Sequence, residues 1–100
     1  MSNIANVSDL TPQQLRQIKE AGKRGQILEA RYPFTTGLLL HKIHDRLILE
    51  IVKAGFEVTQ DAHDGGLITR SHIICFRGNA WDVVIMGRAL DNYLKQWSAD

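Results

Sequence analysis

Apolar residues between Leu38 and Ala54 recur with a helical period and form two stripes instead of one. At about 100° per residue the stripes lie on roughly opposite sides. A helix that is apolar on two sides has to be covered on two sides. The pattern therefore predicts a long helix whose second stripe is covered by its own domain or by a second copy of the protein. The first stripe consists of Leu40, Ile43, Leu47, Ile51 and Ala54, and the second of Leu38, Ile48, Leu49 and Val52.

A capping signature predicts an earlier helix that begins just after Thr11. Thr11 can cap the helix, Pro12 suits its first position and Gln14 completes a capping box. The apolar positions that follow keep a helical spacing, which Gly22 and Gly25 interrupt. Each interior glycine costs about 1 kcal/mol against alanine. We therefore expect a helix that is weak at its glycines.

The helical pattern continues to Leu28 and ends before Pro33, because proline disfavours helical geometry in the residue that precedes it. Beyond Gly55 the pattern changes to the alternation that is typical of strands. A polar turn is expected at 61–66, a hairpin turn at 77–80 and a short amphipathic helix at 90–97. The predicted strands are 56–60, 67–76 and 81–86.

These elements predict an α+β fold class, with two N-terminal helices, a three-stranded antiparallel meander and a short C-terminal helix. Residues 1–10 are small and polar with scattered apolar positions, so we expect a flexible tail there. Residues 11–100 are expected to form a single α+β domain, because one hundred residues is close to the commonest domain size.

Composition is ordinary for a soluble globular chain, with 44% hydrophobic and 23% charged residues. The apolar runs are much shorter than the roughly 20 residues of a membrane span. The first ten residues lack the basic start and apolar stretch of a signal peptide. A single cysteine, Cys75, excludes an internal disulfide and fits a reducing compartment. We expect a cytoplasmic protein without a membrane partner.

Candidate metal ligands do not converge in the sequence. His41 and His44 lie three residues apart on the predicted long helix, and His63 can join them in a site. His72 and Cys75 are three residues apart on a predicted strand, so they should point to opposite faces. We therefore expect no metal site and no cofactor.

The sequence also lacks a convincing catalytic set. Cys75 lies between apolar neighbours, where a thiol is structural rather than nucleophilic. Asp61, His63 and Asp64, together with Glu50, invite comparison with metal-dependent nucleases, but no predicted strand carries an acidic residue followed by a lysine. A polar turn explains these residues better. We expect a protein that is not an enzyme, and a small metal-dependent hydrolase around His63 and Asp64 is the third choice.

Basic residues gather on the first helix, although twelve Lys and Arg against eleven Asp and Glu leave a net charge of only +1. Arg16, Lys19 and Lys23 share a helix face, and Lys23 with Arg24 lies between two glycines, where backbone amides can meet a phosphate. Aromatic residues interleaved with basic ones, which nucleic-acid binding favours, are not visible. The predicted partner-binding residues are therefore Arg16, Lys19, Lys23 and Arg24, which can contact either protein or nucleic acid.

A well-patterned chain with excess apolar residues and no catalytic or cofactor motif points to a binding protein. The leading hypothesis is a small intracellular protein-interaction module that binds and modulates or inhibits a larger protein or nucleoprotein machine. Accessory proteins of phages and mobile elements, including anti-defence inhibitors of the anti-CRISPR kind, share this size and character. A homodimer is expected through Leu38, Ile48, Leu49 and Val52. The alternative is a nucleic-acid-binding regulator that uses the basic first helix.

Overall fold

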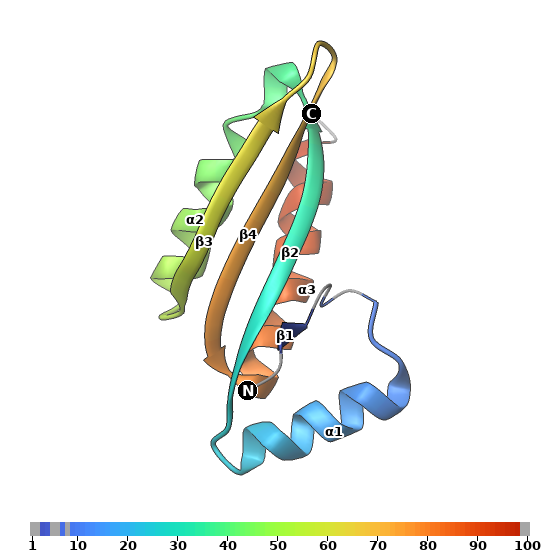
Figure 1. The fold of residues 1–100 in the computed structure, drawn as a ribbon, viewed down its shortest axis with the longest axis vertical. Coiled ribbons are helices and arrows are strands. Elements are labelled where there is room, and N and C mark those ends of the chain that lie inside the picture. The colour runs from blue at the N-terminus through green and yellow to red at the C-terminus, as the bar shows by residue number, and fades with distance from the viewer. Residues whose placement is uncertain (1–2, 5–6, 8, 99–100) are drawn as a thin grey trace.

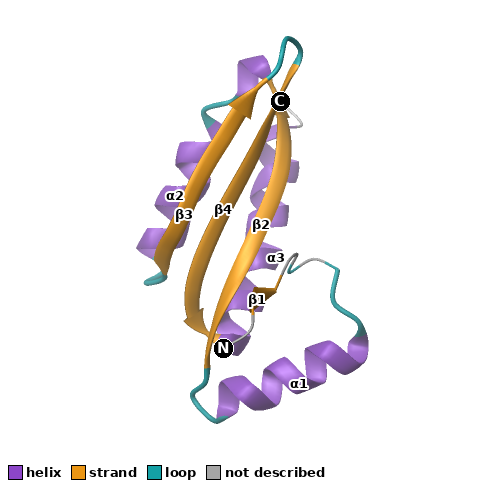
Figure 2. Ribbon diagram, in the orientation of Figure 1, coloured by secondary structure: helices purple, strands orange, loops and turns teal. Residues whose placement is uncertain are grey.

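The computed structural model describes residues 3–4, 7 and 9–98, and it shows a twisted sheet with two helices on one of its faces (Figures 1 and 2). This arrangement is an α+β fold. In chain order the elements are β1 (Asn3–Ile4), α1 (Pro12–Lys23), β2 (Ile27–Gly37), the 3₁₀ helix η1 (Leu38–Leu40), α2 (Ile43–Lys53), β3 (Glu57–Gly65), β4 (Thr69–Asn79) and α3 (Ala80–Ser98).

The sheet has the strand order β1-β2-β4-β3, so the last strand in the chain lies between two earlier ones. Both β2 and β3 run antiparallel to β4, and they are therefore parallel to each other. Helix α2 makes the crossover connection that two parallel strands of one sheet require, and β4 lies between these strands. Helix α3 follows β4 and lies beside α2 on the same face of the sheet (Figure 1).

The hydrophobic core lies between this face of the sheet and the two helices. Alternate residues of β2 and β4 point into it, and α2 and α3 each contribute one apolar face. The first stripe of the sequence pattern is the one that faces the sheet, because its middle residues are buried. The main core residues are Ala30, Tyr32, Ile74, Phe76, Ile43, Leu47, Ile51, Val83, Met86 and Leu90.

The opposite face of the sheet carries neither α2 nor α3 (Figure 1). Its side chains are largely polar, and Arg77 of β4 forms an ion pair there with Glu57 of β3. Cys75 on the same face is only 8% exposed, and its thiol contacts Gln60 at 3.7 Å. Cys75 is therefore buried as predicted, and this burial raises the pKa of its thiol.

The predicted order of two N-terminal helices followed by a meander is wrong, because residues 27–37 form the strand β2. Leu28, Ala30 and Tyr32 fit a period of two as well as a helical pattern, and the three are buried in the strand. Pro33 lies on the stretch of β2 that β1 does not reach. Among the described residues no other strand pairs with that side of Pro33, and a proline is tolerated at a strand edge, where its missing N–H takes no ladder bond.

The predicted strand at 81–86 and the hairpin turn before it are also wrong, because β4 runs to Asn79 and α3 starts directly after it. The β-branched run that ends at Ile85 favours a strand locally. Burial of Val83, Met86 and Leu90, which are spaced i, i+3 and i+7, overrides that preference. The side-chain Oδ1 of Asn79 accepts from the backbone N–H of Trp81 at 3.1 Å and so caps the helix.

Two further boundaries differ from the sequence pattern. The single helix predicted over 38–54 is divided into η1 and α2, and the polar turn predicted at 61–66 is mostly strand, since β3 runs to Gly65. The capping box of Thr11 and Gln14 is confirmed, with both of its hydrogen bonds present. Gly55 closes α2 with a φ of 95°, in the left-handed region that glycine adopts readily.

The flexible tail predicted for residues 1–10 stays a prediction, and part of it lies outside the described residues. Asn3 and Ile4 pair with β2. Val7 is 3% exposed and belongs to the core. It packs on Gly87 of α3 so closely that a Cβ at that glycine would collide with the valine side chain.

The Gly87→Ala substitution tests this packing, because the sign of its effect on the free energy of unfolding depends on whether Val7 lies against α3. Alanine is favoured over glycine in a helix interior by about 1 kcal/mol, so a flexible tail predicts stabilisation. The collision with Val7 instead predicts a loss of about 1–3 kcal/mol in urea denaturation. A chain that lacks residues 1–8 is the control, because there the same substitution should stabilise. A more stable full-length variant would contradict the packing of Val7 on α3.

Candidate functional site

A chain of hydrogen bonds joins four side chains in the interior near one end of the sheet. The hydroxyl of Thr36 lies 2.8 Å from Nε2 of His72, and Nδ1 of His72 lies 2.9 Å from Nδ1 of His44. Nε2 of His44 is in turn bonded to the carboxylate of Asp61. The four residues come from β2, β4, α2 and β3, in that order. We call them the histidine relay.

The middle of the histidine relay is removed from water. His44 and His72 are 3% and 2% exposed, and Thr36 is 6% exposed. Phe34 stacks on the His72 ring, with centroids 4.5 Å apart and planes 4° from parallel. At the other end the Asp61 side chain is 50% exposed. The relay therefore leads from a buried hydroxyl to a carboxylate that water can reach.

Donor and acceptor rules define the direction of every hydrogen bond in the relay when both histidines are neutral. A carboxylate only accepts, so His44 donates through Nε2 to Asp61, and its Nδ1 is an acceptor. His72 must then donate through its own Nδ1, which leaves its Nε2 to accept the hydroxyl proton of Thr36. All three hydrogen bonds point from Thr36 toward Asp61.

The surroundings of His72 oppose its protonation. Burial is the main cause that lowers the pKa of His72 from 6.5 to about 4, and His44, His63, Arg70 and His41 add to it through their positive or potentially positive charge. Arg70 lies opposite Thr36 in the β2–β4 ladder, and its Nε atom is buried without a hydrogen-bond partner. Basic groups therefore surround His72, whereas the carboxylate of the relay, Asp61, is bonded to His44.

The structure brings together some of the histidines that the sequence singled out. His44 and His63 lie with ring centroids 5.4 Å apart, whereas His41 is exposed and bonds the backbone oxygen of Leu38. His72 and Cys75 do point to opposite faces of the sheet, as expected from their spacing. In the described residues, no group of three or more His, Cys, Asp or Glu side chains is arranged to hold a metal ion.

Sequence reasoning missed the relay, although part of its signal was present. His44 is spaced i+3 and i+7 from Leu47 and Ile51, so it shares the helix face that is buried. Thr36 and His72 occupy the inward positions of their strands. The pairing of β2 with β4 is what brings Thr36 close to His72, and that pairing was not predicted.

A second feature at the same end of the sheet is a group of exposed apolar side chains. Leu39 and Leu67 are both 95% exposed, Ile68 is 81% exposed and Leu38 is 38% exposed. Gly37 pairs with Thr69, so η1 and the β3–β4 turn leave the sheet at the same place. Figure 2 shows both segments at the end of the molecule that is farthest from α1. We call Leu38, Leu39, Leu67 and Ile68 the apolar tip.

The four predicted self-association residues do not all lie on one element, because three are on α2 and Leu38 is not. Leu38 belongs to η1, and Ile48 is partly buried against the core. Leu49 and Val52 are more than half exposed on α2.

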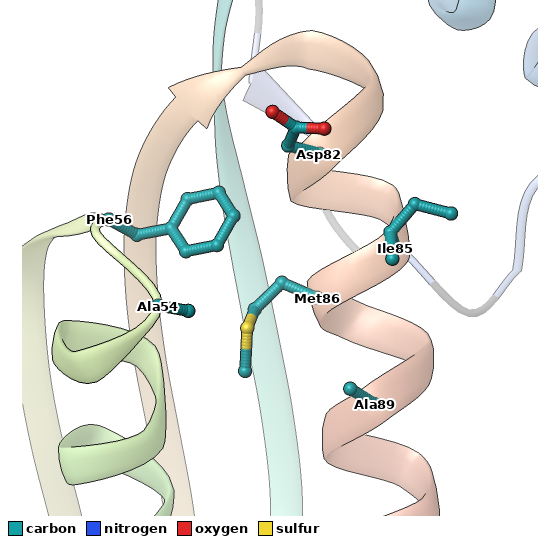
Figure 3. A pocket seen from close by; sticks show the side chains of 6 residues that line it. All are labelled: Ala54, Phe56, Asp82, Ile85, Met86 and Ala89. Atoms are coloured by element: carbon teal, nitrogen blue, oxygen red, sulfur yellow. The ribbon is translucent and has the colours of Figure 1, made fainter.

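A mainly apolar groove of about 260 Å³ lies between the C-terminal end of α2 and α3 (Figure 3). Its lining consists of Ala54, Phe56, Asp82, Ile85, Met86 and Ala89.

The predicted partner-binding residues Arg16, Lys19, Lys23 and Arg24 are all exposed on or next to α1. Lys23 pairs with Glu20 at 3.4 Å, and the ammonium of Lys19 lies 5.7 Å from the centroid of the Trp81 ring. Helix α1 is at the opposite end of the molecule from the apolar tip (Figure 1). The basic surface and the apolar tip are therefore separate candidate sites.

Comparison of the chain with protein-family models, curated proteins and solved structures finds no match. Within the part of the chain that the structure describes, no helix combines the length and apolarity that crossing a membrane requires. The functional proposal therefore rests on the geometry of the molecule itself.

Proposed function

We propose that this protein is a small protein-interaction module that binds its partner through the apolar tip. The observation that carries the proposal is the exposure of Leu39, Leu67 and Ile68, which place nearly whole apolar side chains in water at one point. Burying one such side chain contributes roughly 1.5–3 kcal/mol. Clusters of this kind on a folded protein mark interaction sites.

The backbone around the apolar tip supports the proposal, because it holds the exposed side chains in a defined arrangement. The β2–β4 ladder continues to the Gly37–Thr69 pair, directly below the tip. The backbone N–H of Gly66 donates to the carbonyl of Thr69 at 2.8 Å and closes the turn. A preorganised surface loses less conformational entropy when it binds. An apolar cleft on a larger protein is the matching partner surface, and occupying it would modulate or inhibit that protein.

The nucleic-acid-binding alternative has weaker support. It relies on the basic residues of α1, where Glu20 partly neutralises Lys23. The partly buried Trp81 ring already has the Lys19 ammonium 5.7 Å and the Arg88 guanidinium 5.8 Å from its centroid, and both cations compete with a base that would stack there. Phosphate groups require cationic contacts, whereas the apolar tip presents nearly fully exposed aliphatic side chains. These contacts favour a protein partner.

The double variant Leu39→Ser/Leu67→Ser tests the proposal. Both side chains are almost fully exposed, so the fold should be unaffected, whereas partner affinity should fall at least about 100-fold if both are buried on binding. The measurement is affinity capture from native lysate with and without nuclease, followed by titration of the captured protein.

Two control variants separate the surfaces. Leu49→Ser/Val52→Ser removes a matched pair of exposed apolar side chains from α2 and should leave partner binding unchanged. Lys23→Glu/Arg24→Glu reverses charge on the basic surface. Loss of the partner in this charge variant or on nuclease treatment, with binding retained by the tip variant, would overturn the proposal in favour of nucleic acid.

A further inference from the structure

The histidine relay brackets both segments that form the apolar tip. Thr36 and His44 lie on either side of η1 in the chain, and Asp61 and His72 lie on either side of the β3–β4 turn. The hydrogen bonds of the relay therefore connect the start and the end of both tip segments to one another. When the relay opens, the two segments lose this connection.

We propose that the histidine relay is a pH-sensitive latch that holds the apolar tip in its binding arrangement and releases it on acidification. The effect on partner binding rests on the proposed function of the tip, whereas the opening of the two segments does not.

The central hydrogen bond of the latch depends on a single proton. Nδ1 of His44 and Nδ1 of His72 are 2.9 Å apart, so one of them must donate and the other accept. His72 already donates through Nδ1, so a further proton goes to its Nε2 and leaves that hydrogen bond in place. It turns the hydroxyl of Thr36 from donor to acceptor and creates an imidazolium in contact with His44, away from water.

The groups packed around His72 make its charged form unfavourable while the latch is closed. Basic groups approach His72 from three elements and from a residue between η1 and α2: these are His44 of α2, His63 of β3, Arg70 of β4 and His41. The carboxylate of Asp61 bonds His44 and not His72. Strand β2 adds only the uncharged Thr36 and Phe34. Opening lets water reach the imidazoles and removes this penalty.

The size of the response follows from the difference between the closed and open states. The pKa of His72 is about 4 in the closed state and close to the ordinary 6.5 when the ring is hydrated. The closed state binds fewer protons than the open state. It is therefore favoured at a pH above 6.5, and its population relative to the open state decreases as the pH falls toward 4. Between neutral pH and about pH 5, the opening equilibrium constant should rise about 20-fold.

Hydrogen exchange of the protein alone, without a partner, tests the latch. The reporters are the amide of Gly66, which donates to Thr69, and the amide of His44, which donates to the backbone carbonyl of His41. After correction for intrinsic exchange rates, their opening constants should rise about 20-fold from neutral pH to about pH 5. Their opening free energy should remain below that of amides at the centre of β4, with circular dichroism showing a folded chain.

Two variants identify the titrating group. His72→Gln keeps a donor and an acceptor but does not titrate, so its exchange should lose the pH dependence. His63→Gln removes a nearby exposed histidine outside the relay and should keep most of the pH dependence, because burial and not His63 is the main cause of the low pKa of His72. If His72→Gln does not fold, ¹⁵N NMR of the wild-type imidazoles at neutral pH replaces it. His72 should then carry its proton on Nδ1, and a proton on Nε2 instead would contradict the relay.

Opening constants that do not change with pH would overturn the latch, as would reporter amides that exchange only through global unfolding. Retention of the pH dependence by His72→Gln would do the same. None of these results depends on what the tip binds, because no partner is present. A failure of the latch is thus distinguishable from a failure of the proposed function, which the tip variants test separately.

Discussion

Acidification from about pH 7.5 to pH 4 is expected to lower the free energy of unfolding by about 3 kcal/mol through His72 alone. The pKa of His72 is lowered from 6.5 to about 4 in the folded protein, mainly by burial. Below the ordinary value the unfolded chain therefore binds a proton that the folded chain does not. Stability is fully present above about pH 6.5 and is lost progressively as the pH falls to 4, where the folded protein also begins to bind the proton.

Urea denaturation across this pH range is the measurement, and a loss of this size is a large fraction of the 5–15 kcal/mol typical of a domain. His72→Gln is the control, because glutamine can occupy the same hydrogen-bonding positions without titrating. Its stability at neutral pH should be lower, but its curve should be flatter between pH 6.5 and 4. A wild-type midpoint that stays constant over this range would contradict the burial of a neutral His72.

Leu47→Ala is expected to cost about 3–5 kcal/mol, whereas Leu49→Ala should cost less than about 0.5 kcal/mol in the monomer. The two leucines lie two residues apart on α2 and differ only in environment. Leu47 is fully buried against the sheet, so its removal leaves a cavity. Leu49 is 56% exposed. Chemical denaturation of both variants compares the inner and outer faces of one helix, and equal losses would contradict the observed packing of α2.

The outer face of α2 also carries the prediction of self-association. Val52 is 54% exposed, so Val52→Asp should leave the folded monomer intact. If this face joins two copies, a buried unpaired carboxylate would separate them. Sedimentation velocity should then show a dimer for the wild type and a monomer for the variant. A variant that remains a stable dimer would remove Val52 from the interface.

Features that depend on neighbouring residues in the chain were determined by the sequence itself. The capping box of Thr11 and Gln14 forms as expected, because both of its hydrogen bonds span only three residues. Gly55 ends α2, because glycine adopts a positive φ without steric cost. The buried stripe of α2 and the burial of Cys75 also follow from local apolar pattern.

Only the tertiary structure decided the elements whose local preferences are ambiguous. Residues 27–37 contain good helix formers but become a strand, because pairing with β4 and burial of Tyr32 are available only in the folded sheet. The β-branched residues at the start of α3 become helical because Val83 and Leu90 then face the core together.

The histidine relay and the apolar tip depend on the same long-range pairing. Thr36 and His72 meet because β2 pairs with β4, and His44 reaches them because α2 crosses over the sheet. Leu39 and Leu67 lie at one end because the Gly37–Thr69 pair ends the β2–β4 ladder there. The residue pattern within a single helix or strand does not predict these contacts. The sequence by itself therefore determined the capping box of α1, the glycine that ends α2 and the inner face of α2. Strand register decided which distant side chains became neighbours.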